Sequence, residues 1–220
     1  KESATAGFDI VAYTGNATAR TISHSLSAVP HMMIVKTRSD LNEWGVYHQS
    51  IGNTKFLNMN KTDALGDDSG YWNDTTPTSS VFSVGSGGTT NANTITTIAY
   101  LFSEKQGFSK FGSYTGNGNV DGTFVYTGFK PAMVITKTYD SGAADWTIYD
   151  NKRDPFNVIT GQIQPNKSDA ESTSTSVDFL SNGFKGRNVY RSANYSGSYI
   201  YMAFAEAPFV NSNGVPCNAR

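Results

Sequence analysis

The sequence has few of the groups that enzymes and nucleic-acid-binding proteins depend on. Charged residues make up 16% of its 220 residues, and the formal net charge is −1. We therefore expect no basic surface for nucleic acid or for an anionic membrane. The single cysteine, Cys217, excludes an internal disulfide bond. No apolar run is long enough for a membrane-spanning helix, so we expect no membrane insertion.

Motifs for catalysis and metal binding are also missing. The three histidines, His24, His31 and His48, lack the spacing of zinc ligands. There is no Gly-x-Ser-x-Gly turn, and glutamate is too scarce to favour a glycosidase carboxylate pair. The Asp and Asn clusters at 63–68 and 117–121 offer oxygen ligands for Ca²⁺, but such clusters are usually solvated turns. We predict no enzymatic activity, metal site or cofactor.

Helical periodicity is absent, and the composition favours strands joined by tight turns. Gly, Ser, Thr and Asn are abundant, and most apolar clusters are short, aromatic or β-branched. Residues 131–149 give a hairpin pattern, with a turn at 139–142. The closing segment 199–204 is apolar on both faces, which predicts a central strand. Such segments number roughly seven or eight per 100 residues, a spacing typical of sandwiches and barrels.

The chain repeats itself over roughly 100 residues, the size of a small domain rather than of a solenoid repeat. Five segments return in the same order and at similar spacing. In the first copy they are 13–16, 30–36, 44–47, 60–64 and 98–104, and in the second they are 114–117, 131–137, 146–149, 166–170 and 200–206. We interpret this as a tandem duplication. The histidines have no counterparts in the second copy, so the copies share no catalytic histidine.

The predicted fold is all-β, with two tandem, homologous antiparallel β-sandwich units that are jelly-roll-like. The first unit is expected at residues 1–105, the second at 106–207, and an extended tail at 208–220. A closed barrel in each unit is the alternative. Because the chain begins with Lys1 and not with methionine, we expect a fragment or a processed product.

One loop of the first copy stands out as a candidate ligand-binding site. Tyr71, Trp72, Asn73 and Asp74 combine flat aromatic faces with amide and carboxylate groups, which suit the C–H face and the hydroxyls of a sugar. The second copy has only small polar residues at 171–176. The alternative is that Trp72 folds back and packs against the sandwich. The duplicated residues Trp44 and Trp146 are expected in the core.

Several segments resemble those of an uncharacterised domain family at the C-terminal ends of large structural proteins of marine bacteriophages. They include AYTGN (12–16), VPHMMIVKTRSDLNEWGVYH (29–48), YWNDTTPTSSVFSVG (71–85) and YIYMAFAEAPFV (199–210). The resemblance covers residues 7–210, and it carries over no catalytic residues. It implies a structural role in the virion, in a tail fibre or another adhesin-like appendage.

From this resemblance we expect a non-enzymatic tail-fibre or receptor-binding module of a phage particle. Its expected partners are other virion proteins and a host cell-surface glycan or protein, with assembly as a homo-oligomer, a trimer being favoured. The alternative is a purely structural or decorating protein of the capsid or tail that has no ligand of its own.

Overall fold

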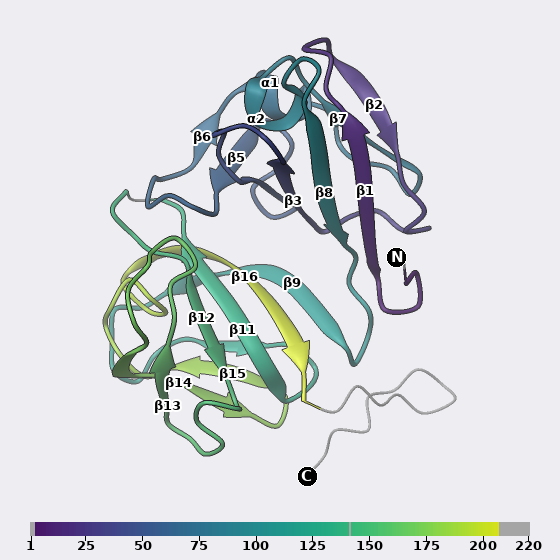
Figure 1. Ribbon diagram of the computed structural model, residues 1–220. Coiled ribbons are helices and arrows are strands. Elements are labelled where there is room, and N and C mark those ends of the chain that lie inside the picture. The colour runs from purple at the N-terminus through teal and green to yellow at the C-terminus, as the bar shows by residue number, and fades with distance from the viewer. Residues whose placement is uncertain (1–2, 141, 207–220) are drawn as a thin grey trace. The chain divides into compact units, whose positions relative to one another are not determined.

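The computed structural model describes residues 3–140 and 142–206, which form sixteen strands and two one-turn helices (Figure 1). The predicted tail at 208–220 and Cys217 lie outside the described residues. In chain order the elements are β1 (Phe8–Thr14), β2 (Arg20–Ser23), β3 (Met32–Thr37), β4 (Gly45–His48), β5 (Lys55–Asn58), β6 (Gly66–Asp67), α1 (Ser69–Trp72), β7 (Val81–Val84), α2 (Gly88–Asn91), β8 (Thr96–Phe102), β9 (Ser109–Gly116), β10 (Phe124–Tyr126), β11 (Pro131–Thr138), β12 (Thr147–Asp150), β13 (Ile159–Gln162), β14 (Ser172–Leu180), β15 (Gly183–Gly186) and β16 (Gly197–Ala205).

These elements divide into two compact units of eight strands each. Unit 1 holds the chain up to Asn60 together with Leu65–Glu104. Unit 2 holds Lys61–Ala64 and the chain from Lys105 onward. The segment Lys61–Ala64 belongs to unit 2 although it lies within the first sequence copy.

Unit 1 pairs a six-stranded antiparallel sheet with a two-stranded ribbon. The sheet has the order β1-β8-β3-β4-β5-β6, and the ribbon consists of β2 and β7. Its core joins both layers, since Ile22 and Phe82 of the ribbon cluster with Met33, Val35 and Leu101 of the sheet. Burial alternates along β8, where Thr97, Ala99 and Leu101 are buried, so this strand has one inward face.

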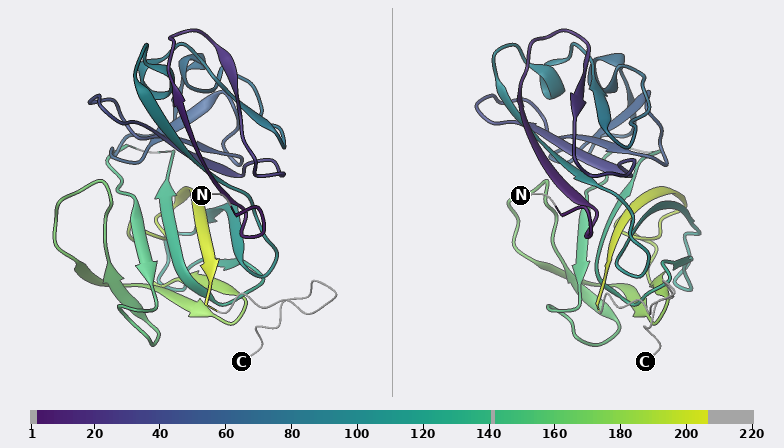
Figure 2. Two further views of the ribbon diagram at one scale, coloured as in Figure 1. Left: turned by 45° about the vertical axis from the view of Figure 1, so that its right-hand side comes forward. Right: turned by 90° about the vertical axis from the view of Figure 1, so that its right-hand side faces the viewer.

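Unit 2 is a sandwich of two four-stranded antiparallel sheets (Figures 1 and 2). One sheet has the order β12-β11-β16-β9 and the other β10-β15-β14-β13. Side chains from both sheets meet in one core, in which Val134 and Tyr201 of the first pack with Phe179 and Phe184 of the second. The closing strand, β16, is central to its sheet, as its two apolar faces predict.

The two units share strand order and several side-chain contacts. The order β1-β8-β3-β4 in unit 1 matches β9-β16-β11-β12 in unit 2, and the pair β2-β7 matches β10-β15. The Tyr13 hydroxyl donates to Thr90 O at 2.5 Å, and the Tyr114 hydroxyl donates to Ala193 O at 2.6 Å. These correspondences support the tandem duplication, which remains an inference.

The duplicated tryptophans have different surroundings. The backbone N–H of each donates to an asparagine side chain at 3.0 Å, Trp44 to Asn60 and Trp146 to Asn166. Trp146 is 1% exposed, but Trp44 is 38% exposed. The expectation that both lie in the core is therefore correct for Trp146 and wrong for Trp44.

Candidate functional site

The loop selected from the sequence places its aromatic rings inside unit 1. Asp68 caps α1 by accepting a hydrogen bond from the backbone N–H of Gly70, and the one-turn helix directs Tyr71 and Trp72 inward. Trp72 is 1% exposed, and its indole N–H donates to Lys55 O at 3.1 Å. Tyr71 is 8% exposed.

The hypothesis of an exposed stacking face at Trp72 is therefore wrong, and the alternative of a packed ring is confirmed. Asn73 and Asp74 remain on the surface with left-handed backbones, at φ 52° and 47°. They lack an exposed aromatic neighbour within the loop, because both rings are in the core. This loop stabilises unit 1, and we look for a recognition site elsewhere.

An open groove of about 540 Å³ lies on unit 2. Three segments that are distant in sequence line it: the β11–β12 loop with the start of β12, the end of β13, and the β15–β16 loop. We call it the unit 2 groove; its lining residues are Ala143, Ala144, Asp145, Thr147, Gln162, Gln164, Val189, Tyr190, Arg191, Ser192 and Tyr195.

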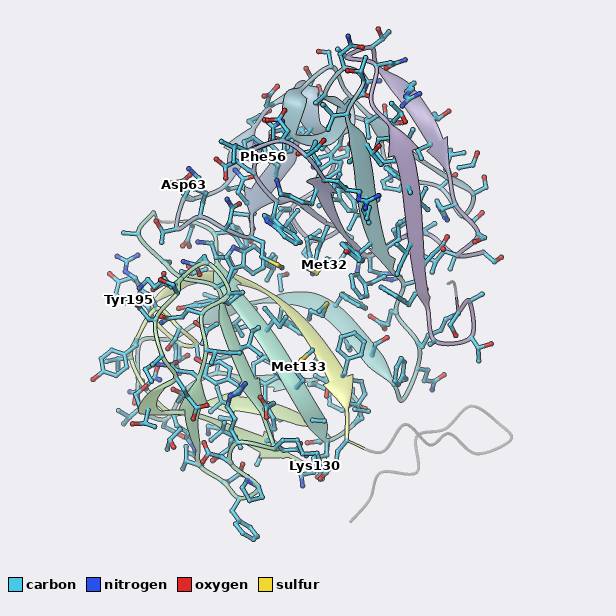
Figure 3. All side chains as sticks on the ribbon, in the orientation of Figure 1. Met32, Phe56, Asp63, Lys130, Met133 and Tyr195 are labelled. Carbon is cyan, nitrogen blue, oxygen red and sulfur yellow. The ribbon has the colours of Figure 1, made fainter. Side chains whose placement is uncertain are left out.

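Two exposed tyrosines stand at this groove, both on the β15–β16 loop. Tyr190 is 60% exposed and Tyr195 is 42% exposed, and Figure 3 shows Tyr195 at the periphery of unit 2. The Arg191 guanidinium lies 4.6 Å from the centre of the Tyr195 ring, a cation–π contact. Exposed rings beside polar groups are typical of sites that recognise other molecules.

The loop that carries these tyrosines is braced by hydrogen bonds. The N–H groups of Asn194 and Tyr195 donate to Tyr190 O at 3.0 and 2.9 Å, and the N–H of Tyr190 donates to Asn188 Oδ1 at 2.9 Å. The fully buried Asn194 side chain donates to Asn188 O at 3.0 Å. The backbone that carries the rings is therefore braced before a ligand arrives, which lowers the entropic cost of ordering this loop on binding.

The inner side of the groove is polar. Burial raises the pKa of Tyr149 to about 12, and the nearby hydroxyls of Ser192, Ser176 and Thr147 oppose this rise. The Tyr149 hydroxyl also lies 3.4 Å from Gln162 Oε1. Thr147 Oγ1 and Ser192 Oγ are buried and lack a hydrogen-bond partner of good geometry among the described residues.

Charged groups at the groove already have partners. Asp145 accepts from the Asn166 side chain at 2.7 Å and pairs with Lys167 Nζ at 2.8 Å. This pairing raises the pKa of Lys167. Arg191 stacks on Tyr195 and also lies 3.5 Å from Gly142 O. The groove thus combines aromatic faces and amide or hydroxyl groups with little uncompensated charge.

The described part of the chain contains neither a cluster of metal-binding side chains nor a helix that could span a membrane. Among residues 3–140 and 142–206, no three His, Cys, Asp or Glu side chains gather as a metal site would require. Within the same ranges, no helix has the length and apolar character needed to cross a membrane.

Sequence reasoning missed this groove because its lining comes from three separate stretches without a motif. One signal was available in the repeat itself. The Asn91 side chain exchanges hydrogen bonds with Asn16 as the Asn194 side chain does with Asn117, so Asn91 and Asn194 are equivalent. Counting back four and three residues from each asparagine, Gly87 and Gly88 of unit 1 correspond to Tyr190 and Arg191 of unit 2. Small residues in one copy thus align with large, exposed residues in the other.

The fold defines a two-unit, nearly all-β protein with an open groove on its second sandwich. Over residues 2–208 the chain matches the family described as a domain of unknown function (DUF7483), and it belongs to that family. No curated protein and no solved structure matches it.

Proposed function

We propose that this chain is a non-enzymatic structural protein of a bacteriophage virion, a distal tail-fibre or receptor-binding module. The unit 2 groove is the part that contacts the host surface. The observation that carries the proposal is the pair of exposed rings, Tyr190 and Tyr195, on a loop braced by the buried Asn194. The sequence resemblance to phage structural proteins supports the assignment to the virion, in its tail.

Binding without catalysis is favoured by the state of the groove's carboxylate. Asp145 is the one carboxylate among the described lining residues, and both of its oxygens accept from Asn166 and Lys167. Hydrolysis of a glycosidic bond requires two carboxyl groups on either side of it. A carboxylate held by an amide and an ammonium group serves better to shape the groove than to transfer protons.

A second candidate, a decorating protein of the capsid or tail, is favoured by β10. This strand lies at the edge of its sheet, and Phe124 and Tyr126 project from it into solvent. An exposed strand edge with aromatic side chains is suited to pairing with another chain. The same edge offers a contact for the expected homo-oligomer, in which several copies would multiply a weak attachment.

Antibody labelling of whole particles separates these functions. We expect antibodies against the chain to label the tail of the phage that encodes it, and to block adsorption of that phage to its host. Label over the capsid with unimpaired adsorption would favour the decorating role. Particles that carry no label would overturn the virion assignment altogether.

A further inference from the structure

The unit 2 groove corresponds to a place that unit 1 fills with its own side chain. Strand register establishes the correspondence: Val46 pairs with Leu57 in unit 1 as Ile148 pairs with Ile163 in unit 2. The neighbouring pair in unit 1 is Gly45 with Asn58. The equivalent positions in unit 2 are Thr147 and Gln164, which both line the groove.

In unit 1 the ring of Tyr71 occupies this place. It stacks on Phe56 with ring centres 3.7 Å apart and planes within 8° (Phe56 is labelled in Figure 3). The Tyr71 hydroxyl lies 3.2 Å from Asn58 Oδ1 and 3.4 Å from Thr89 Oγ1. A side chain at Gly45 would meet the same ring, since a Cβ there would lie 3.2 Å from Tyr71 Cε1. Unit 1 therefore holds a flat, hydroxyl-bearing ring in its own site.

Unit 2 lacks this internal occupant and has different residues at the positions around it. The segment equivalent to α1 is part of strand β14, so no tyrosine enters from that side. In unit 1, glycine at 87 is needed because a Cβ there would lie 2.8 Å from Gly70 O of α1. Unit 2 carries Tyr190 at the equivalent position, which is possible because α1 is absent. The groove is thus the open counterpart of a filled site.

The residues at the base of the groove differ between the units, and this difference changes which kind of ligand ring the groove can accept. Phe56 and Asn58 of unit 1 correspond to Gln162 and Gln164, so an apolar stacking surface is replaced by a second amide. Aromatic faces are supplied instead by Tyr190 and Tyr195. A phenol carries one polar group, but the base of the groove offers several donors and acceptors. A pyranose matches it, because its C–H face stacks on a ring and its hydroxyls meet amides.

We propose that the unit 2 groove binds one pyranose ring of an uncharged saccharide, in the place that Tyr71 occupies in unit 1. Asp145 is paired with Lys167 and Arg191 stacks on Tyr195, so the polar contacts left for a ligand come from amides and hydroxyls, which suit an uncharged saccharide. This inference rests on the proposed function, since it names the ligand class of the same recognition site.

Amide chemical shifts of the ¹⁵N-labelled full chain test this directly. The probes are D-glucose, D-galactose, D-mannose and N-acetyl-D-glucosamine, with p-cresol as a phenol. We expect at least one saccharide to shift the side-chain amides of Gln162 and Gln164 and the backbone amides of 189–195. Contacts of this kind predict a Kd in the millimolar range. The amides of unit 1 around Asn58 should not move, because Tyr71 already fills that site.

Two variants fix the location. Tyr195→Ala should weaken saccharide binding by roughly 2- to 12-fold, the range of a single aromatic contact. Phe156→Ala removes another exposed aromatic ring of unit 2, one outside the groove, and should leave the affinity unchanged. Equal effects of both variants, or shifts outside the groove, would overturn the assignment. Binding of p-cresol alone would also overturn it and would indicate a tyrosine of a protein partner.

Adsorption of the chain to host cells separates this inference from the proposed function. If a saccharide binds in the groove and the chain does not adsorb, the ligand class stands and host attachment fails. If the chain adsorbs, loses adsorption in Tyr195→Ala and is not displaced by any of the saccharides, attachment stands and the ligand class is wrong.

Discussion

Replacing Asn194 by alanine tests whether one buried amide holds the groove loop in place. Its side chain makes five hydrogen bonds. The amide oxygen accepts from the N–H groups of Asn117 and Thr123, both at 3.2 Å. The amide nitrogen donates to Asn117 Oδ1 at 2.9 Å, Asn119 O at 2.6 Å and Asn188 O at 3.0 Å. Alanine removes all of these bonds at once.

The expected cost follows from the number of bonds and their surroundings. A net contribution of about 0.5–1.5 kcal/mol for each hydrogen bond would give a total near the upper end of single-residue effects. Asn117 and Asn119 are exposed, however, so water can replace part of what they lose. We therefore expect Asn194→Ala to destabilise unit 2 by roughly 2–4 kcal/mol.

Native-state amide hydrogen exchange measures this loss in each unit separately. A loss of 2–4 kcal/mol corresponds to a fall of roughly 30- to 700-fold in the protection of β16 amides. Asn91→Ala is the matched control, since Asn91 makes the equivalent bonds to Asn16 in unit 1. It should lower the protection of β8 and leave saccharide binding intact, while Asn194→Ala should weaken both β16 protection and binding.

Two results would refute this reasoning. A fall of less than about fivefold in β16 protection, near 1 kcal/mol, would mean that water or a rearranged loop replaces the amide. Unchanged saccharide affinity in a clearly destabilised Asn194→Ala variant would mean that the loop is placed by its other contacts, such as the bonds to Tyr190 O.

Trp146→Ala should lower the free energy of unfolding in urea by about 3–5 kcal/mol because the ring is buried. Trp44→Ala should lower it distinctly less because that ring is partly exposed, and equal losses would contradict this. Burial lowers the pKa of Lys137 to about 8. Between pH 8 and 10 the unfolded chain therefore binds more protons than the folded chain, and the free energy of unfolding should rise by on the order of 2 kcal/mol. Lys137→Met should abolish this rise, and a rise that persists would implicate another group. Sedimentation equilibrium should detect a trimer, whereas a strict monomer at high concentration would remove the avidity argument.

Local sequence patterns were sufficient to predict the all-β fold class with antiparallel sheets. Alternating apolar residues and Gly or Asn turns define each strand by short-range steric and burial preferences. The doubly apolar segment 199–204 identified a central strand for the same reason. The burial of Trp72 was one of two alternatives, because the residues alone do not say which way a one-turn helix will face. The Asp68 cap fixes that direction only in the folded unit.

The groove was not predicted, because no motif within unit 2 marks it and only a comparison of the two copies reveals it. Its position follows from the replacement of helix α1 by part of strand β14, a change that leaves no motif in the sequence. Its aromatic residues, Tyr190 and Tyr195, looked like ordinary loop residues among serines and asparagines. Comparing the two copies for glycine in one against a large side chain in the other would have found them. The longer loop at 65–77 drew attention to the copy whose site is filled.

The contrast between the units also predicts where a ligand should stabilise the protein. Unit 1 gains the burial of the Tyr71 ring, on the order of 1.5–3 kcal/mol for a large side chain, but its site is no longer available. Unit 2 forgoes that gain and keeps its site open. A saccharide at ten times its Kd should therefore restore ~1.4 kcal/mol to unit 2 and nothing to unit 1. Hydrogen exchange with and without the saccharide checks this. An equal increase in the protection of β8 and β16 on adding the saccharide would mean that the groove is not the site that binds.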